Sequence, residues 1–320
     1  MSIFGAIGSF IMTPLYYAIS VVLTGFHKLF STFLPEASGA AWALSIVGLT
    51  ITIRAALIPL FVKQIKSSRN MQLLQPQVKE LQKKYGHDRE KLTQETMKLY
   101  KEAGTNPFAS CLPILLQMPI FLALFRLLDL AAKEETRGVL THEQALQFAH
   151  AELFGVPISA TFMKADGVLG VQIMALVLVL AMLVTTFFTQ RQLMTQNMPK
   201  SALEGPYAQQ QKILLYVLPV VFAVGGVAFP IGVLIYWTVS NLWTMGQQFY
   251  VIRNNPVPGT PAAEAKAKRD ALKAARHGGS APTTTVVEEQ APQAPAPTRQ
   301  QPKKQTREQR KKNRPQGEQK

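Results

Sequence analysis

The chain has 320 residues, of which 48% are hydrophobic and only 17% charged, and its formal net charge is +15. The apolar residues gather in long blocks with the charges between them, a pattern typical of integral membrane proteins. The single cysteine, Cys111, excludes an internal disulfide. The first residues, 1–13, have no basic region and no small-residue cleavage site, so we expect no removable signal peptide.

The first apolar stretch, 14–34, contains His27, Lys28 and a Tyr16-Tyr17 pair, residues suited to a membrane interface. We favour an amphipathic helix that lies on the membrane, within an outer N-terminal segment 1–40, over an additional membrane-spanning helix.

Four apolar blocks then predict membrane-spanning helices. The last block, 213–250, is of double length and contains Gly225-Gly226 and, four residues later, Pro230, so we expect a turn there and two helices. The sequence therefore predicts an all-α integral membrane protein with a five-transmembrane-helix bundle. The expected spans are 41–62, 108–128, 168–188, 213–228 and 229–250.

The segment between the first two spans, 63–107, predicts a helical hairpin with its body at 66–104. Apolar residues three or four positions apart give each helix a narrow seam. Gly86 can end the first helix, and Asp88 can cap the second.

Orientation follows from Lys and Arg in the loops, because cytoplasmic loops retain an excess of these residues. The range 63–107 holds ten of them, whereas 129–167 holds three against six acidic residues. We therefore expect 129–167 and the N-terminus outside, and the hairpin, the 189–212 loop and the C-terminus in the cytoplasm of a bacterial cell, with the protein in its plasma membrane.

The C-terminal segment, 251–320, carries fifteen basic residues, and its Ala, Pro, Gln and Thr content from Pro256 onward predicts a disordered cytoplasmic tail. Such a tail is attracted to anionic lipids or to ribosomal RNA. The alternative is a segment that serves only topology and solubility.

Arg54 is the most informative residue, because it lies near the middle of the first predicted span. At ~1.5 Å rise per residue it is roughly 13 Å from Lys63, where the loop charges begin. A charge at that depth normally faces water, a counter-ion or the bundle interior, and it marks a functional site.

Polar residues on other spans suggest neighbours for this arginine, although each of them alone is also explained as a contact between helices. Residues four positions apart share a helix face, and three such faces turned inward would line a partly hydrated groove. Against this, Pro113 and Pro119 are also explained as kinks, and Met118 as packing. The faces are Thr50 with Arg54, Pro113 with Gln117 and Phe121, and Trp237 with Asn241.

Enzymatic chemistry is not indicated. The spans contain no Ser/His, Cys/His or paired-Asp arrangement, the chain has no phosphate loop, and His142-Glu143 lacks the second histidine of a zinc helix. We expect no catalytic residue, no cofactor and no metal, and a chain that binds and moves something without consuming nucleotide.

Four separated motifs resemble the YidC/Oxa1/Alb3 family of membrane protein insertases. The likeness covers about residues 14–252, and its specificity comes from the order and spacing of the motifs. They are IRAALIPL at 53–60, MQLLQPQVKELQKKY at 71–85, NP at 106–107 with CLPILLQMPIF at 111–121, and YWTVSNL at 236–242.

The resemblance implies five spans around a hydrophilic groove, closed toward the outside and open to the cytoplasm and laterally to lipid. Arg54 would be the groove arginine, and the hairpin 66–104 would be a mobile element that receives substrate. Without a large outer domain before the first span, the chain is similar to the shorter form found in Gram-positive-type bacteria. The path of a nascent transmembrane segment would pass Thr50, Pro113, Gln117, Met118, Phe121 and Trp237.

The implied partners are nascent membrane proteins, the Sec translocon, the ribosome and anionic lipids. Two other interpretations of Arg54 stay open at this stage. In a small-anion transporter it would bind the solute, although no convincing internal repeat is present. In a structural assembly factor it would pair with a carboxylate of a partner subunit, and nothing would move.

Overall fold

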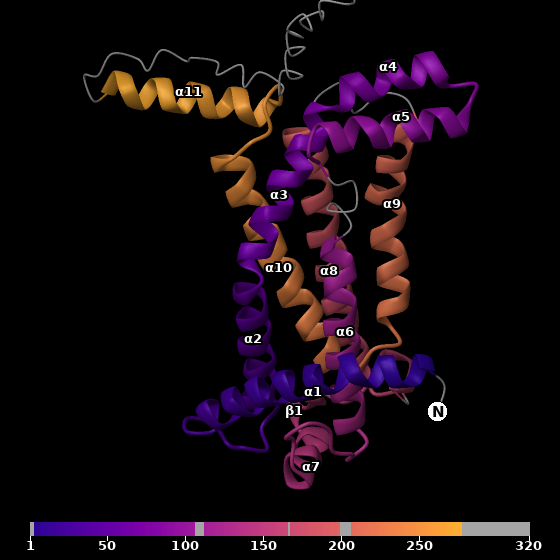
Figure 1. The fold of residues 1–320 in the computed structure, drawn as a ribbon. Helices are drawn as coiled ribbons and strands as arrows, with labels where there is room; N and C mark the ends of the chain where they lie inside the picture. The colour runs from indigo at the N-terminus through magenta and orange to yellow at the C-terminus, as the bar shows by residue number, and fades with distance from the viewer. Residues whose placement is uncertain (1–2, 106–111, 166, 199–205, 277–320) are drawn as a thin grey trace, which may run out of the picture.

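The computed structural model describes residues 3–105, 112–165, 167–198 and 206–276, and these are mostly helical, as the sequence predicted (Figure 1). Two short strands, β1 (Glu152–Leu153) and β2 (Val156–Pro157), form an antiparallel hairpin, and a 3-10 turn, η2, covers Phe162–Lys164. The α-helices are α1 (Ile3–Phe30), α2 (Gly39–Ala56), α3 (Ile58–Leu73), α4 (Gln75–Tyr85), α5 (Arg89–Glu102), α6 (Leu112–Ala131), α7 (His142–His150), α8 (Leu169–Asn197), α9 (Pro206–Gly226), α10 (Ile231–Asn254) and α11 (Pro261–Arg276).

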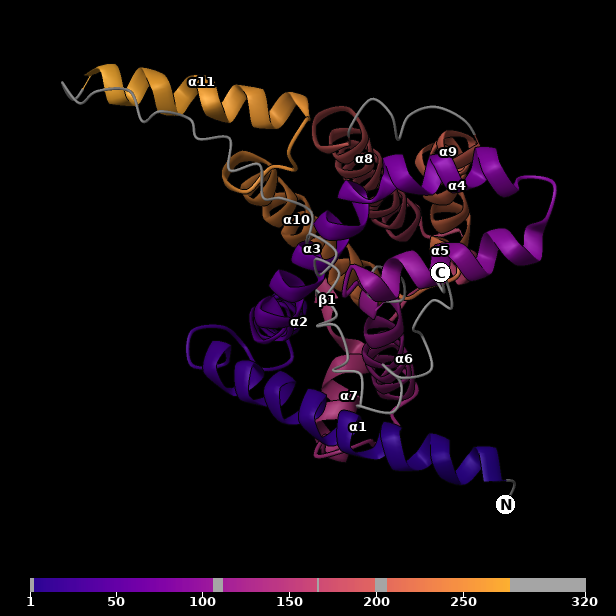
Figure 2. The same ribbon diagram turned by 45° about the horizontal axis from the view of Figure 1, so that its top comes forward.

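The long helices form a bundle in which α10 packs between α2 and α8, and α9 packs on α8. Figure 1 shows α1 lying across the lower end of this bundle, while the α4–α5 hairpin lies across the opposite end. Figure 2 shows α11 projecting away from the bundle at the hairpin end. A single long helix therefore crosses one end of the bundle, and a helical hairpin crosses the other end.

Two of the described helices are long and apolar enough to cross a membrane, namely α2 and α8. A shorter apolar stretch covers Leu215–Gly226 in α9. Several helices extend past the predicted limits of the spans, because a helix continues in polar sequence as long as no residue breaks it. Thus α8 runs to Asn197, nine residues beyond the predicted end, and α10 runs to Asn254.

The prediction of one continuous helix at 41–62 is wrong. The helix α2 ends at Ala56, and α3 begins at Ile58, with Leu57 between them. Pro59 explains the break, because its nitrogen cannot donate to the carbonyl of Ala55 four residues earlier. At the break itself, the Leu57 N–H donates to the carbonyls of Ile53 and Ala55.

The prediction of disorder from residue 251 onward is also wrong for the described part of the tail. The helix α10 continues to Asn254, and α11 follows, packed against α8 and α10. The link between them is fixed, since the Asn197 side chain accepts a 3.0 Å hydrogen bond from the Val257 N–H. Average composition concealed an Ala-, Lys- and Arg-rich segment with high helix propensity. Residues 277–320 lie outside the described structure.

The α4–α5 hairpin has the expected turn between its helices. The Asp88 side chain accepts a 3.0 Å hydrogen bond from the Lys91 N–H and so caps α5, while α4 ends at Tyr85. Leu74 and Val78 are buried, and Gly104 ends the unit with a φ of 63°, a conformation that glycine adopts without strain.

The range 129–165, predicted as part of an outside loop, folds into a compact unit with α1 and α2, which we call the outer unit after that prediction. The helix α7 begins with a capping box between Thr141 and Gln144. The loop also binds the start of α10, where the N–H groups of Ile231 and Gly232 donate to the carbonyls of Ala160 and Ile158. These first N–H groups have no partner within their own helix, so the contact satisfies them.

The core of this outer unit is Trp42, which is fully buried. Its ring stacks on His27 of α1 with centroids 3.8 Å apart and meets the ring edge of Phe148 of α7 at 5.3 Å. His27 Nε2 donates a 2.9 Å hydrogen bond to the Glu36 carbonyl. One tryptophan therefore joins three elements that are distant in sequence.

Burial lowers the pKa of His27 below its ordinary value of 6.5, although the Glu36 carbonyl and carboxylate act in the opposite direction. The unfolded chain then takes up a proton before the folded chain does, so stability decreases as pH falls below about 6.5. We expect the Tm of the solubilised protein to fall between about pH 8 and about pH 5.5, and His27→Gln to flatten this dependence. The exposed His142→Gln is the control, and an unchanged slope in His27→Gln would contradict the assignment.

Candidate polar site inside the helical bundle

Arg54 lies in the last turn of α2, and its side chain is only 9% exposed. Its Nε donates a 3.0 Å hydrogen bond to Ser240 Oγ of α10, and its Nη2 donates to the same oxygen. The guanidinium also lies 5.9 Å from the ring centroid of Phe61 of α3. The arginine is therefore held inside the bundle at the level of the α2–α3 break.

Arg54 has no carboxylate partner among the residues that the structure describes. Its partner Ser240 is neutral, and so is Tyr236, which precedes Ser240 by one turn of α10. Tyr236 Oη accepts a 2.7 Å hydrogen bond from Gln117 Nε2 of α6. A polar row thus runs from α2 through α10 to α6. Because its hydrogen-bond partner Ser240 is neutral, the positive charge of Arg54 stays available to an anionic group.

Two glutamines of this interior retain hydrogen-bonding capacity. Among the described residues, no hydrogen-bond partner reaches the buried Gln117 Oε1 or either of the buried polar side-chain atoms of Gln64 on α3. Buried polar atoms cost free energy unless water or a ligand binds them. Gln64 was missed by sequence reasoning because the predicted span stopped at Val62, before the turn of α3 that carries it.

Thr50 lies on the Arg54 face of α2 and is fully buried. Its hydroxyl donates a 2.6 Å hydrogen bond to the Ile46 carbonyl of the same helix. Thr50 therefore lies one turn before Arg54 on the same face of α2, and its hydroxyl proton is already used in this hydrogen bond.

Aromatic rings surround the α6 end of the polar row. The Phe121 ring lies 5.1 Å from Trp237 and 6.0 Å from Phe229, and it also meets Tyr236 at 6.4 Å. The predicted residues Phe121 and Trp237 are therefore brought together, half-buried, beside Gln117. This cluster forms an apolar wall next to polar groups.

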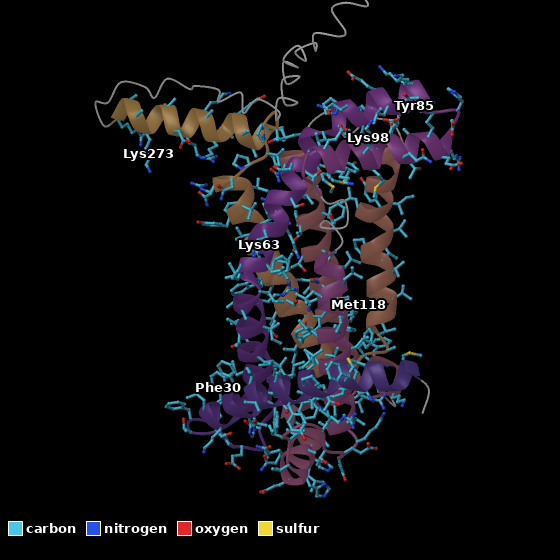
Figure 3. All side chains as sticks on the ribbon, viewed as in Figure 1. Phe30, Lys63, Tyr85, Lys98, Met118 and Lys273 are labelled. Atoms are coloured by element: carbon cyan, nitrogen blue, oxygen red, sulfur yellow. The ribbon has the colours of Figure 1, made fainter. Side chains whose placement is uncertain are left out.

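Met118 is 48% exposed on α6, where Figure 3 labels it. Leu115 and Leu122, three before and four after it, are exposed on the same face. Pro113 lies in the first turn of α6, and its side chain is outside the described part of the structure.

Asn241 is not brought to Arg54. Its Nδ2 donates a 3.1 Å hydrogen bond to Thr186 Oγ1 of α8, so it joins α10 to α8. The face of α10 that meets Arg54 carries Tyr236 and Ser240 instead. These two residues are also four apart, a signal equal to that of Trp237 and Asn241, and only the rotation of α10 distinguishes the two pairs. Within the described ranges, no group of three or more His, Cys, Asp or Glu side chains is suited to a metal ion.

The mostly helical fold, two apolar helices long enough to cross a membrane and a polar interior around a buried arginine fit the class of integral membrane proteins. The chain belongs to the 60Kd inner membrane protein family, whose model matches residues 33–258. The family resemblance seen in the sequence is thereby confirmed.

Several bacterial relatives are named membrane protein insertase YidC. The chain is 45% identical over 286 residues to the protein of Streptomyces avermitilis, with 87% of this chain and 66% of that protein covered. The protein of Mycolicibacterium paratuberculosis is 36% identical, with 74% of each chain covered. That of Tropheryma whipplei strain Twist is 36% identical, with 81% and 89% covered.

A solved structure described as an active YidC insertase with its first transmembrane domain resolved is also similar. It shares 24% sequence identity, covers 73% of this chain and 46% of that chain, and has a TM-score of 0.47.

Proposed function

We propose that this protein is a membrane protein insertase, which inserts nascent transmembrane segments and helps them fold through a hydrophilic intramembrane groove, independently of or together with the Sec translocon. The observation that carries the proposal is Arg54, buried between α2 and α10 without a carboxylate partner in the described structure. Its family relatives named as insertases support the same function.

The proposed topology has five spans: α2 with the start of α3, then α6, α8, α9 and α10. The basic α4–α5 hairpin and α11 lie at one end of the bundle, and the acidic outer unit with α1 lies at the other (Figure 1). By the excess of Lys and Arg, the hairpin end faces the cytoplasm and the N-terminus faces outside. The direction of α1 across the bundle end supports an interfacial helix.

In the proposed mechanism, Arg54 attracts an acidic or polar outer segment of the substrate part-way into the membrane. In low-dielectric surroundings a carboxylate feels this charge far more strongly than at a surface. Ser240 fixes the guanidinium, and Gln117 offers a free acceptor to water or to the substrate backbone. Burial of the substrate's apolar helix, at ~25 cal/mol per Å², then supplies the driving force without nucleotide.

A lateral exit between α6 and α9 fits this mechanism. In the described structure α9 packs on α8, and extensive packing against α6 is absent. Both helices expose large apolar side chains that suit contact with lipid or with a passing apolar segment. These are Leu115, Met118 and Leu122 on α6, and Ile213, Val217, Val220 and Val224 on α9.

The proposed partners follow from the charges at the cytoplasmic end. The hairpin would receive the nascent chain from the ribosome, and its exposed Lys83, Lys84 and Lys98 suit contact with ribosomal RNA or anionic lipids. Figure 3 shows Lys98 and Tyr85 at this end, opposite Phe30. Cooperation with the Sec translocon is part of the same proposal, through the family resemblance.

Site-specific crosslinking tests the proposal against a purely structural role. With a photoreactive phenylalanine analogue at Gln117 or at Trp237, we expect adducts to ribosome-stalled chains that present a transmembrane segment. Leu176, exposed on α8, is the matched control and should give several-fold fewer adducts. Equal yields at all three positions, or none at Gln117 and Trp237, would favour an assembly factor, and uptake of a small anion into proteoliposomes would favour a transporter.

A further inference from the structure

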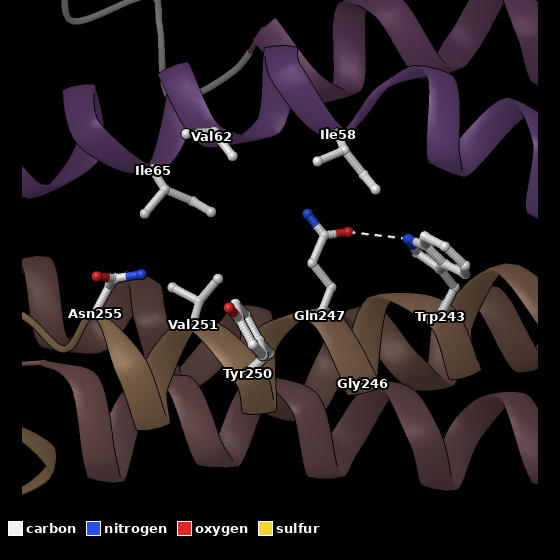
Figure 4. A pocket seen from close by; sticks show the side chains of 9 residues that line it. All are labelled: Ile58, Val62, Ile65, Trp243, Gly246, Gln247, Tyr250, Val251 and Asn255. Atoms are coloured by element: carbon white, nitrogen blue, oxygen red, sulfur yellow. Dashed lines mark hydrogen bonds between the residues drawn. The ribbon is translucent and has the colours of Figure 1, made fainter. Parts of the chain in front are cut away.

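A hollow lies between α3 and the cytoplasmic half of α10, and none of its lining residues belongs to the Arg54 site. Its volume is about 580 Å³. Figure 4 shows apolar side chains pointing from each helix toward the other across it. The lining residues are Ile58, Val62 and Ile65 from α3, and Trp243, Gly246, Gln247, Tyr250, Val251 and Asn255 from α10 and its end.

The groove follows from local sequence on both helices. After the break at Leu57, Ile58, Val62 and Ile65 recur at four and three positions, so they share one face of α3. On the α10 wall, Gly246 leaves a gap, since a Cβ built there meets nothing within 4 Å. The Trp243 ring is tied to its own helix by a 3.1 Å hydrogen bond from Nε1 to Gln247 Oε1.

The groove is open and apolar. Ile58 and Val62 are 42% and 45% exposed, and Tyr250 is 64% exposed. Its α10 residues begin twelve positions after Ile231, or roughly 18 Å along the helix, which places the groove in the cytoplasmic half of the proposed span. Apolar walls at that depth face the acyl chains of the cytoplasmic leaflet.

The cytoplasmic end of the groove is basic. Arg253 is exposed at the end of α10, and Arg269 of α11 donates a 2.7 Å hydrogen bond from Nη2 to the Arg253 carbonyl. The Arg269 guanidinium is thus anchored at the end of α10, where Arg253 is exposed and Asn255 lines the groove. An apolar slot with two arginine residues at its cytoplasmic end is complementary to a lipid with an anionic phosphate.

We propose that this groove binds an acyl chain of an anionic phospholipid from the cytoplasmic leaflet, with its phosphate at Arg253 and Arg269. The volume fits ligand pockets of ~300–1,000 Å³, whereas a spanning helix ~30 Å long and ~10 Å wide fills roughly 2,400 Å³. The proposal rests on the membrane topology given above. It assigns the groove to lipid and the α6–α9 opening to substrate.

Tryptophan fluorescence tests this directly, because the chain has only three tryptophans. The full-length variant Trp42→Phe with Trp237→Phe retains Trp243 alone, inside the groove. It is reconstituted in two vesicle mixtures of phosphatidylglycerol and phosphatidylcholine of identical composition, in which only one lipid or the other carries bromine. We expect at least twofold stronger quenching of Trp243 when phosphatidylglycerol carries the bromine.

Filling the groove from either wall, by Gly246→Leu or Val62→Phe, should bring that quenching ratio to one. Gly225→Leu on α9 is the matched control, because a Cβ at Gly225 also meets nothing within 4 Å, and the ratio should persist there. Equal quenching by both lipids in the parent, or a ratio unchanged by both filling variants, overturns the proposal. Weak quenching by both lipids with an emission that depends on protein concentration overturns it in favour of a second copy of the chain.

The outcome is separable from that of the proposed function. If the lipid assignment alone is wrong, crosslinks from Gln117 to nascent chains persist while the quenching ratio is one. If the chain does not span the membrane, alkaline carbonate extracts the protein from the vesicles, and the quenching ratio is also one.

Discussion

Replacing Arg54 with alanine is expected to abolish complementation of a strain depleted of its own insertase. The charge-assisted hydrogen bonds that Arg54 offers are worth about 1.5–3 kcal/mol, so loss of substrate attraction corresponds to roughly a 10- to 150-fold lower insertion rate. Arg54→Lys should retain part of the activity, because a charge remains without the fork that holds Ser240. Arg54→Glu should be at least as defective as alanine, because it repels acidic segments.

Two variants separate electrostatics from folding. Arg126→Ala removes an exposed arginine from the outer part of α6 and should leave insertion unchanged. Ser240→Ala keeps the charge of Arg54 but releases its side chain, so we expect a smaller loss than with Arg54→Ala. All variants are compared at equal membrane content and thermal stability. Full activity of Arg54→Glu in correctly folded protein would refute the electrostatic mechanism.

Trp42→Ala is expected to give the largest loss of stability in the outer unit. The side chain is fully buried between His27 and Phe148, and truncation of a buried aromatic residue costs about 3–5 kcal/mol. Trp42→Phe should cost much less, because it keeps a stacked ring and removes a buried indole N–H that has no partner in the described part of the chain. The measurement is thermal unfolding of the full-length protein in mild detergent.

The matched control for Trp42 is Phe154→Ala. Phe154 is 89% exposed at the tip of the β1–β2 hairpin, so its truncation should change stability by no more than about 0.5 kcal/mol. A loss in Trp42→Ala no larger than that in Phe154→Ala would mean that Trp42 does not hold α1, α2 and α7 together.

Local patterns in the sequence were sufficient for the helical fold class, the family and the position of the informative charge. These patterns are apolar blocks, glycine and proline breaks, and loop charges. Each of them acts within a few turns of helix, so it can be recognised without knowledge of tertiary contacts. These local signals failed where the average composition of a segment hid a helix, and where a proline interrupted an apolar run. The tail composition concealed α11, and the apolar run at 41–62 concealed the break that Pro59 imposes.

Only the tertiary structure decided which residues meet. Ser240 and Asn241 are adjacent in sequence and point about 100° apart on α10, so one reaches Arg54 and the other reaches Thr186. The rotation of α10 depends on its packing against α2 and α8, which no local pattern encodes. The sequence by itself determined that a buried arginine exists. Packing of the helices determined that its described partners are neutral and that α3 and α10 leave a groove between them.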